Sequence, residues 1–175
     1  LMKSPIKDLT TKAPLSLNTL KKLIPKGSIV DSYLFYSGEI EFNLCQSQRF
    51  INAHTISPYI YEFWTSLFDK SSNVYDIANC DLFKFELEMF PILQEHWYKY
   101  GGDPCIRAAL FFTLNRCSSR GLISSGELST VNYNPIALSH LKRFRRPSNF
   151  YVNHDDGSSL IDTLRPNPMA DFMLI

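Results

Sequence analysis

Apolar residues along this chain alternate between short continuous runs and runs with helical spacing. Continuous runs at 28–34 and 49–53 are typical of buried strands in a parallel sheet. Two further strands are expected at 150–152 and 171–175. Because strands and helices alternate, the pattern predicts an α/β fold with a largely parallel sheet.

Helical spacing follows residues that commonly begin helices. Ser16 and Asn134 are suited to cap a helix, and Pro58 to occupy its first turn. Residues 39–44 fit either a helix or an extended segment, and residues 69–81, rich in Ser and Asn, are expected to form a linker. The expected helices are 17–24, 57–68, 80–100 with a kink or break at Pro91, 104–114 and 136–144.

The longest distinctive stretch is 102–122. It starts with turn residues and continues as a helix with one apolar face. It is then expected to become a polar loop carrying Asn115, Arg116 and Arg120. Two guanidinium groups and an amide in such a loop can donate hydrogen bonds to a phosphate or a base. The alternative is a core helix followed by a solvated loop.

Composition limits the classes of protein to consider. The chain has 175 residues, 45% hydrophobic and 14% aromatic, which predicts a single globular domain over 1–175. A net charge of +1 provides no overall basic field, so any nucleic-acid contact must come from local patches. Four scattered cysteines favour reduced thiols and a cytoplasmic location, and no apolar run is long enough to span a membrane.

Several segments resemble one enzyme family. The segment AALFFTLNRCSSRGLISSGELS, residues 108–129, is similar to the part of Dam-type adenine-specific DNA methyltransferases that contacts DNA. The resemblance extends to three other segments. The family's opening motif and first strand resemble residues 12–38, and its second strand with the following helix resembles residues 49–64. The run up to its catalytic strand resembles residues 149–175. The resemblance implies a Rossmann-like methyltransferase domain with S-adenosylmethionine as cofactor. It also implies a mostly helical insertion over 57–145, with a DNA-contacting loop at 115–130.

The resemblance also implies positions for cofactor contacts. Lys12 matches the family's opening lysine, and Asp31 and Tyr33 fill the acidic and aromatic positions at the end of the first strand. Gly38 is the glycine that remains from the turn that follows, where absence of Cβ lets backbone approach a ligand. His54 stands where the family has an acid that accepts hydrogen bonds from the ribose.

Four departures from the family concern its chemistry. Phe35 and Tyr36 stand where glycines are expected, so two rings are predicted to occupy space used by the methionine part. His54 replaces the ribose-binding acid, and Thr10 and Thr11 replace two glycines of the opening motif. No Asp-Pro-Pro-Tyr motif occurs in the 175 residues, so no catalytic residue is assigned. Because residues 171–175 are strand-like, either that motif follows beyond Ile175 or the domain is truncated.

The DNA-binding residues implied by the resemblance are Asn115 and Arg116, which match the family, and Arg120. Arg143 and Arg145, in the basic cluster 142–146, are candidates for phosphate contacts, or else form the solvated end of a helix. The sequence His-Asp-Asp at 154–156 could indicate a metal site. Because three adjacent side chains rarely converge on one ion, a polar turn is favoured and no metal is assigned.

Three functions follow as hypotheses. The leading one is a catalytically inactive methyltransferase-like protein used for binding or as a structural component of a larger protein assembly, with S-adenosylmethionine or no cofactor. The first alternative is an active adenine-specific DNA methyltransferase whose catalytic motif lies beyond Ile175. The second is a non-catalytic module that binds double-stranded DNA. Because the family is common in bacteriophages, the resemblance implies a viral or prophage origin.

Overall fold

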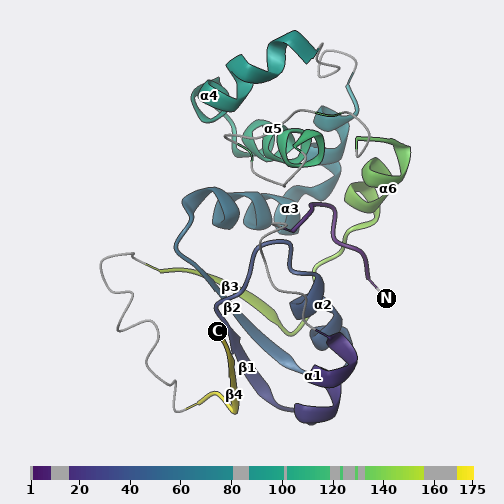
Figure 1. The fold of residues 1–175 in the computed structure, drawn as a ribbon, viewed down its shortest axis with the longest axis vertical. Helices are drawn as coiled ribbons and strands as arrows, with labels where there is room; N and C mark the ends of the chain where they lie inside the picture. Colours follow the sequence, from purple (N-terminus) through teal and green to yellow (C-terminus); the bar gives the residue numbers. More distant parts are fainter. Residues whose placement is uncertain are drawn as a thin grey trace. The chain divides into compact units, whose positions relative to one another are not determined.

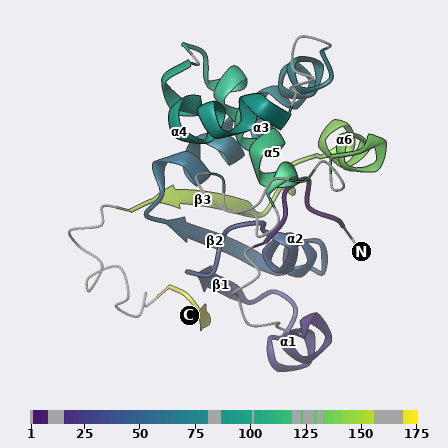
Figure 2. The same ribbon diagram turned by 45° about the horizontal axis from the view of Figure 1, so that its top comes forward.

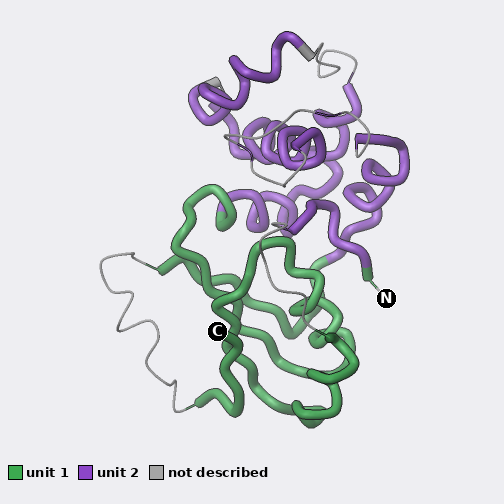
Figure 3. Tube along the Cα trace, in the orientation of Figure 1, with its two compact units in different colours: residues 1–2, 13–61, 146–175 green, residues 3–12, 62–145 purple. Residues whose placement is uncertain are grey.

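The computed structural model describes residues 2–8, 16–80, 87–100, 102–118, 123, 129, 133–155 and 169–175. Its fold is α/β, with a sheet of four parallel strands (Figure 1). The chain divides into two compact units: unit 1 contains residues 1–2, 13–61 and 146–175, and unit 2 contains residues 3–12 and 62–145 (Figure 3).

Unit 1 contains the sheet, whose strand order is β3-β2-β1-β4. The strands are β1 (Ile29–Ser32), β2 (Phe50–Thr55), β3 (Phe150–His154) and β4 (Phe172–Leu174). Parallel neighbours require crossover connections, and α2 (Glu39–Gln46) makes the crossover from β1 to β2. Figure 2 shows β3, β2 and β1 side by side, with α1 (Leu17–Leu23) and α2 next to them. The predicted parallel α/β sheet is therefore confirmed.

Local signals explain the start and end of α1. The Ser16 hydroxyl accepts a hydrogen bond from Thr19 N, as predicted for an N-cap. At the other end, Arg49 is only 4% exposed and donates to the carbonyl oxygens of Lys21 and Ile24. A buried guanidinium at a helix C-terminus satisfies carbonyls that the helix leaves without a partner.

Four helices of the described chain lie between β2 and β3: α3 (Pro58–Ala78), α4 (Phe90–Tyr100), α5 (Pro104–Cys117) and α6 (Pro135–Arg143), with a short 3-10 turn, η2, at Leu87–Met89. Asn134 and Asp103 cap α6 and α5 through their side chains. Pro91 lies in the first turn of α4, where a proline costs no backbone hydrogen bond.

Two expectations about these helices are wrong. The linker predicted from residue 69 is helical as far as Ala78, with non-helical torsion angles only at Lys70 (φ −141°, ψ 47°). Polar side chains there are compatible with helix because Val74 and Ala78 supply a buried face. The α5 helix is buried on nearly all sides rather than on one face: ten of its 14 residues are buried.

Aromatic packing forms the core of unit 2. The ring of Phe63 packs on Phe111 at a centroid distance of 5.0 Å, and Trp64 packs on Phe144 at 5.4 Å. The predicted aromatic stripe of the helix at 58–68 therefore serves packing. Within the ranges given above, no helix is both long and apolar enough to cross a membrane.

Candidate functional site

The carboxyl ends of three strands meet at one edge of the sheet in unit 1. Where β1 pairs with β2, Asp31 lies opposite Asn52. Where β2 pairs with β3, Thr55 lies opposite His154. Asp155 N donates to the Thr55 carbonyl at 2.9 Å, which places Asp155 beside the end of β2. Ligands of open parallel sheets bind outside this edge, where the strand order reverses. Here that reversal lies between β1 and β4.

Four side chains at this edge form one contact group, which we call the His54 cluster: Asp31, Tyr33, His54 and Asp155. The Nδ1 atom of His54 lies 3.0 Å from Asp155 Oδ2, and its Nε2 atom lies 3.7 Å from Asp31 Oδ1. The Tyr33 ring stacks on the imidazole at 4.5 Å between centroids. One imidazole is thus held between two carboxylates and against one aromatic face.

Burial differs across the His54 cluster. Asp31 is 1% exposed, whereas the side chains of His54 and Asp155 are 16% and 21% exposed. Among the atoms that the structure describes, Asp31 Oδ1 and His54 Nε2 are buried and have no hydrogen-bond partner. Burial, with added repulsion from Asp31 and Asp155, raises the pKa of the Tyr33 phenol above its usual value. A phenol is protonated at neutral pH and can donate a hydrogen bond.

The chemistry of this cluster is that of hydrogen-bond acceptance. A neutral imidazole can donate to one carboxylate at a time, and a protonated one to both. Either way the partly exposed Asp155 presents a charged acceptor at the edge of the sheet, and hydrogen bonds to charged groups are the stronger kind. Hydroxyl or ammonium groups of a ligand are suitable donors. Across the part of the chain described here, no three His, Cys, Asp or Glu side chains are placed to hold a metal ion.

Gly38 lies where β1 leads into α2. It is the N-cap of α2 and has φ +73°. A Cβ built there would lie 2.4 Å from Phe42 Cε2 and 2.9 Å from Phe35 Cε2. Glycine is therefore needed both for the backbone conformation and for close packing of two rings.

Phe35 lies in the core of unit 1. It is 5% exposed and packs on Phe42 and on Phe150 of β3, at centroid distances of 6.2 and 5.6 Å. That its ring occupies the space used by the methionine part of the cofactor stays a prediction, and a buried ring is compatible with it. Tyr36 is half-buried.

Asn115 and Arg116, predicted in a polar loop, lie in the last turn of α5 instead. Asn115 has no exposed surface, and its amide pairs with the Lys7 peptide: Oδ1 accepts from Lys7 N at 2.6 Å, and Nδ2 donates to Lys7 O at 3.0 Å. Arg116 Nε donates to the Pro5 carbonyl at 2.7 Å. In this structure both side chains hold the N-terminal segment of unit 2. A DNA contact by either one stays a prediction, and it requires these bonds to open.

The other candidate residues are not part of the His54 cluster. Arg143 and Arg145 are exposed at the C-terminal end of α6, where Arg145 donates to the Lys142 and Phe144 carbonyls. Lys12 and Arg120 lie outside the described residues, so their assignments stay predictions.

Two polar residues of unit 1 were missed in the sequence. For Asp155 the sequence predicts only a polar turn, although its position directly after a strand indicates the carboxyl edge of a sheet. Glu41 is only 2% exposed and accepts a hydrogen bond from the Ser32 hydroxyl at 2.8 Å. Its sequence position in the first turn of α2 carries no signal of burial.

Comparisons with known proteins add no family assignment. A scan against protein-family models finds no match to this chain, and a search of curated proteins finds no significantly similar sequence. The fold and the His54 cluster are therefore the basis for any conclusion about function.

Proposed function

We propose that this chain is a methyltransferase-like protein that binds an S-adenosylmethionine-type ligand at the carboxyl edge of its sheet and does not itself transfer the methyl group. The observation that carries the proposal is the position of the His54 cluster. In a parallel sheet of order β3-β2-β1-β4, the cluster lies at the ends of β1, β2 and β3. That edge is where open α/β folds place nucleoside ligands.

The residues present fit a ligand with ribose hydroxyls. Asp155 supplies a partly exposed carboxylate next to His54, and the Asp31 carboxylate has a buried oxygen without a hydrogen-bond partner within the described chain. We assign Asp155 the acceptor role that the resemblance gives to an acid after the second strand. His54 then serves to position that carboxylate, 3.0 Å away.

The residues that bear on methyl transfer support a binding role. Transfer to adenine needs a group that accepts hydrogen bonds from the exocyclic amine and a ring that stacks on the flipped base. The family supplies both with Asp-Pro-Pro-Tyr, which does not occur in these 175 residues.

Calorimetric titration with S-adenosylmethionine tests the proposal. We expect saturable binding that Asp155→Asn weakens about tenfold, because the acceptor loses its charge and the hydrogen bond to it becomes weaker. Asp76→Asn removes the same charge from an exposed position of α3 and should leave binding unchanged. Absence of binding by a chain that unfolds cooperatively would overturn the proposal, and so would methyl transfer to duplex DNA by the same sample.

An active adenine-specific DNA methyltransferase is the second candidate, and the position of β4 favours it. Tyr33 N donates to the Leu174 carbonyl at 2.9 Å, so the end of β4 lies beside the His54 cluster. In the family that the chain resembles, the catalytic motif directly follows this strand. Finding Asp-Pro-Pro-Tyr after Ile175 in the full gene, with methyl transfer by the full-length protein, would make this the better function.

A further inference from the structure

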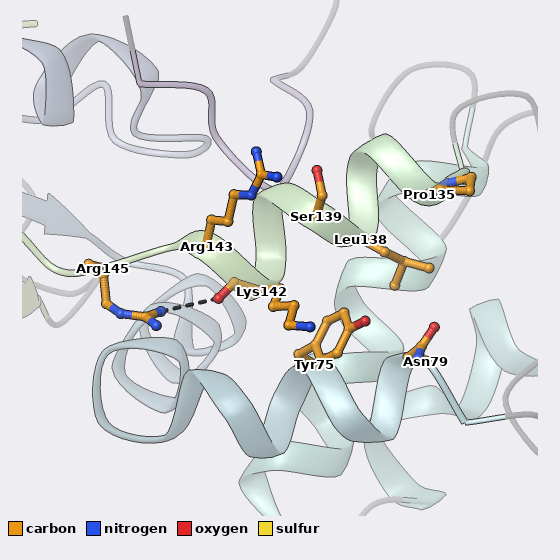
Figure 4. Close-up of a pocket in the computed structure, with 8 residues that line it drawn as sticks. All are labelled: Tyr75, Asn79, Pro135, Leu138, Ser139, Lys142, Arg143 and Arg145. Carbon is orange, nitrogen blue, oxygen red and sulfur yellow. Dashed lines mark hydrogen bonds between the residues drawn. The ribbon is translucent and has the colours of Figure 1, made fainter.

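A pocket in unit 2 combines positive charge with an aromatic ring. It lies between the C-terminal part of α3 and α6 and has a volume of about 560 Å³ (Figure 4). The residues that matter for its chemistry are Tyr75, Asn79, Leu138, Lys142, Arg143 and Arg145. Three of them are cations, and none of the described residues that line the pocket is acidic. The pocket therefore favours an anion.

Lys142 is placed to change partners when an anion binds. Its ammonium lies 5.1 Å from the centre of the Tyr75 ring, and Figure 4 shows the two side chains next to each other. Tyr75 is half-buried, and a cation over an aromatic ring that solvent still reaches is held weakly. A phosphate oxygen is a stronger partner for an ammonium than a ring face is. Movement of Lys142 to a phosphate would uncover the Tyr75 ring for contact with a second part of the ligand.

Arg145 contributes a charge in a fixed place. Its Nη1 donates to the Lys142 carbonyl at 3.1 Å and to the Phe144 carbonyl at 2.7 Å, beyond the last residue of α6. These bonds hold the guanidinium beside the backbone of Lys142, whereas the Lys142 ammonium extends toward Tyr75 (Figure 4). They also offset the partial negative charge of the helix C-terminus, which would otherwise repel an anion.

We propose that this pocket binds a free nucleoside monophosphate, a ligand independent of the one assigned to the His54 cluster. The phosphate lies against Lys142, and Arg143 and Arg145 add positive charge to the lining of the pocket. The base lies on Tyr75, with Asn79 supplying a donor and an acceptor and Leu138 an apolar contact. A volume of about 560 Å³ is that of a small-molecule site and exceeds what inorganic phosphate needs. The ring of Tyr75 and the amide of Asn79 suit a base, and the cations suit a phosphate.

Titration of the chain with cytidine 5′-monophosphate tests the proposal, with inorganic phosphate and cytidine as separate probes. This nucleotide lacks adenine but keeps the ribose, so Asp155→Asn is needed to detect binding at the His54 cluster. We expect saturable binding of the nucleotide that is at least tenfold tighter than that of phosphate or cytidine. Lys142→Gln, at an exposed position, should weaken nucleotide binding about tenfold. Lys99→Gln, an exposed control on α4, and Asp155→Asn should not change it.

Three outcomes would overturn the proposal. Equal affinity for phosphate and nucleotide would reduce the pocket to a simple anion site. Unchanged binding in Lys142→Gln would place the nucleotide elsewhere. Binding of duplex DNA with no binding of the mononucleotide would assign these cations to the nucleic-acid backbone instead. Because the two sites use different variants, failure here leaves the titration with S-adenosylmethionine unaffected.

Discussion

The imidazole of His54 stacks on the phenol ring of Tyr33, with their planes 15° apart and their centroids 4.5 Å apart. His54 belongs to β2, and Tyr33 directly follows β1. The contact therefore links the ends of two neighbouring strands at the edge where we place the ligand. It also fixes the imidazole between Asp31 and Asp155, since the ring face is held while its nitrogens point to the two carboxylates.

Replacement of Tyr33 should therefore affect both stability and the His54 cluster. We expect Tyr33→Ala to lower the free energy of unfolding by about 1–2 kcal/mol, since stacking and partial burial of the ring are both lost. Tyr33→Phe keeps the stacked ring and should cost less than about 0.5 kcal/mol. Urea unfolding of the three proteins measures the difference. Equal losses in the two variants would show that the hydroxyl, and not the ring, carries the interaction.

Two glycines with positive φ provide a matched pair. Gly38→Ala should lower the free energy of unfolding by about 2–3 kcal/mol, because a Cβ meets Phe42 at 2.4 Å and the φ of +73° is unfavourable. Gly27 has φ +85° but no atom within 4 Å of an added Cβ, so Gly27→Ala should cost only about 1 kcal/mol of backbone strain. Chemical denaturation of the two variants tests which one loses more unfolding free energy. A larger loss at Gly27 would contradict the packing described around Gly38.

Asn115 is expected to act as a structural residue of unit 2. Asn115→Ala leaves the Lys7 peptide without both of its side-chain partners, so the free energy of unfolding should fall by about 2–4 kcal/mol. Asn134→Ala removes a helix cap that is more exposed and should cost about 1 kcal/mol. If Asn115→Ala instead reduced affinity for duplex DNA with unchanged stability, the side chain would be a DNA contact as the resemblance implies.

Stability should fall at alkaline pH. Burial raises the pKa of the Cys45 thiol to about 11 and that of Cys117 to about 12, and also raises the pKa of Tyr133 and of Tyr33. Each folded group keeps its proton where the unfolded chain has lost it. These groups therefore stabilise the fold fully below about pH 9, and their contribution is lost as the pH rises toward 11–12.

The Cys45 shift alone corresponds to a loss on the order of 2 kcal/mol between pH 9 and 11. Denaturation at a series of pH values measures this slope. Cys45→Ala should make the slope shallower although the variant is less stable at pH 8. Stability that is constant from pH 8 to 11 would contradict burial of these thiols.

Local sequence determined the elements of this protein, because their signals depend on residues close together in the chain. Ser16 and Asn134 begin their helices by accepting a hydrogen bond from a backbone N–H three residues later. The apolar runs around Val30 and Ile51 form strands buried in the sheet. Asp31, Tyr33 and His54 were identified in the sequence from a resemblance, and the structure brings these three side chains together.

Tertiary structure decided the partners of the polar side chains, because the residues involved are distant in sequence. Asp155 contacts His54 only because β3 pairs with β2, and no local pattern specifies that order. Asn115 binds the Lys7 peptide 108 residues away, which turned an expected loop residue into a buried one. Phe35 packs on Phe42 and Phe150 in the core, and the absence of a Cβ at Gly38 leaves room for the rings of Phe35 and Phe42. A polar or bulky residue acquires its role from the surface that folding places against it, and that surface is assembled from several segments of the chain.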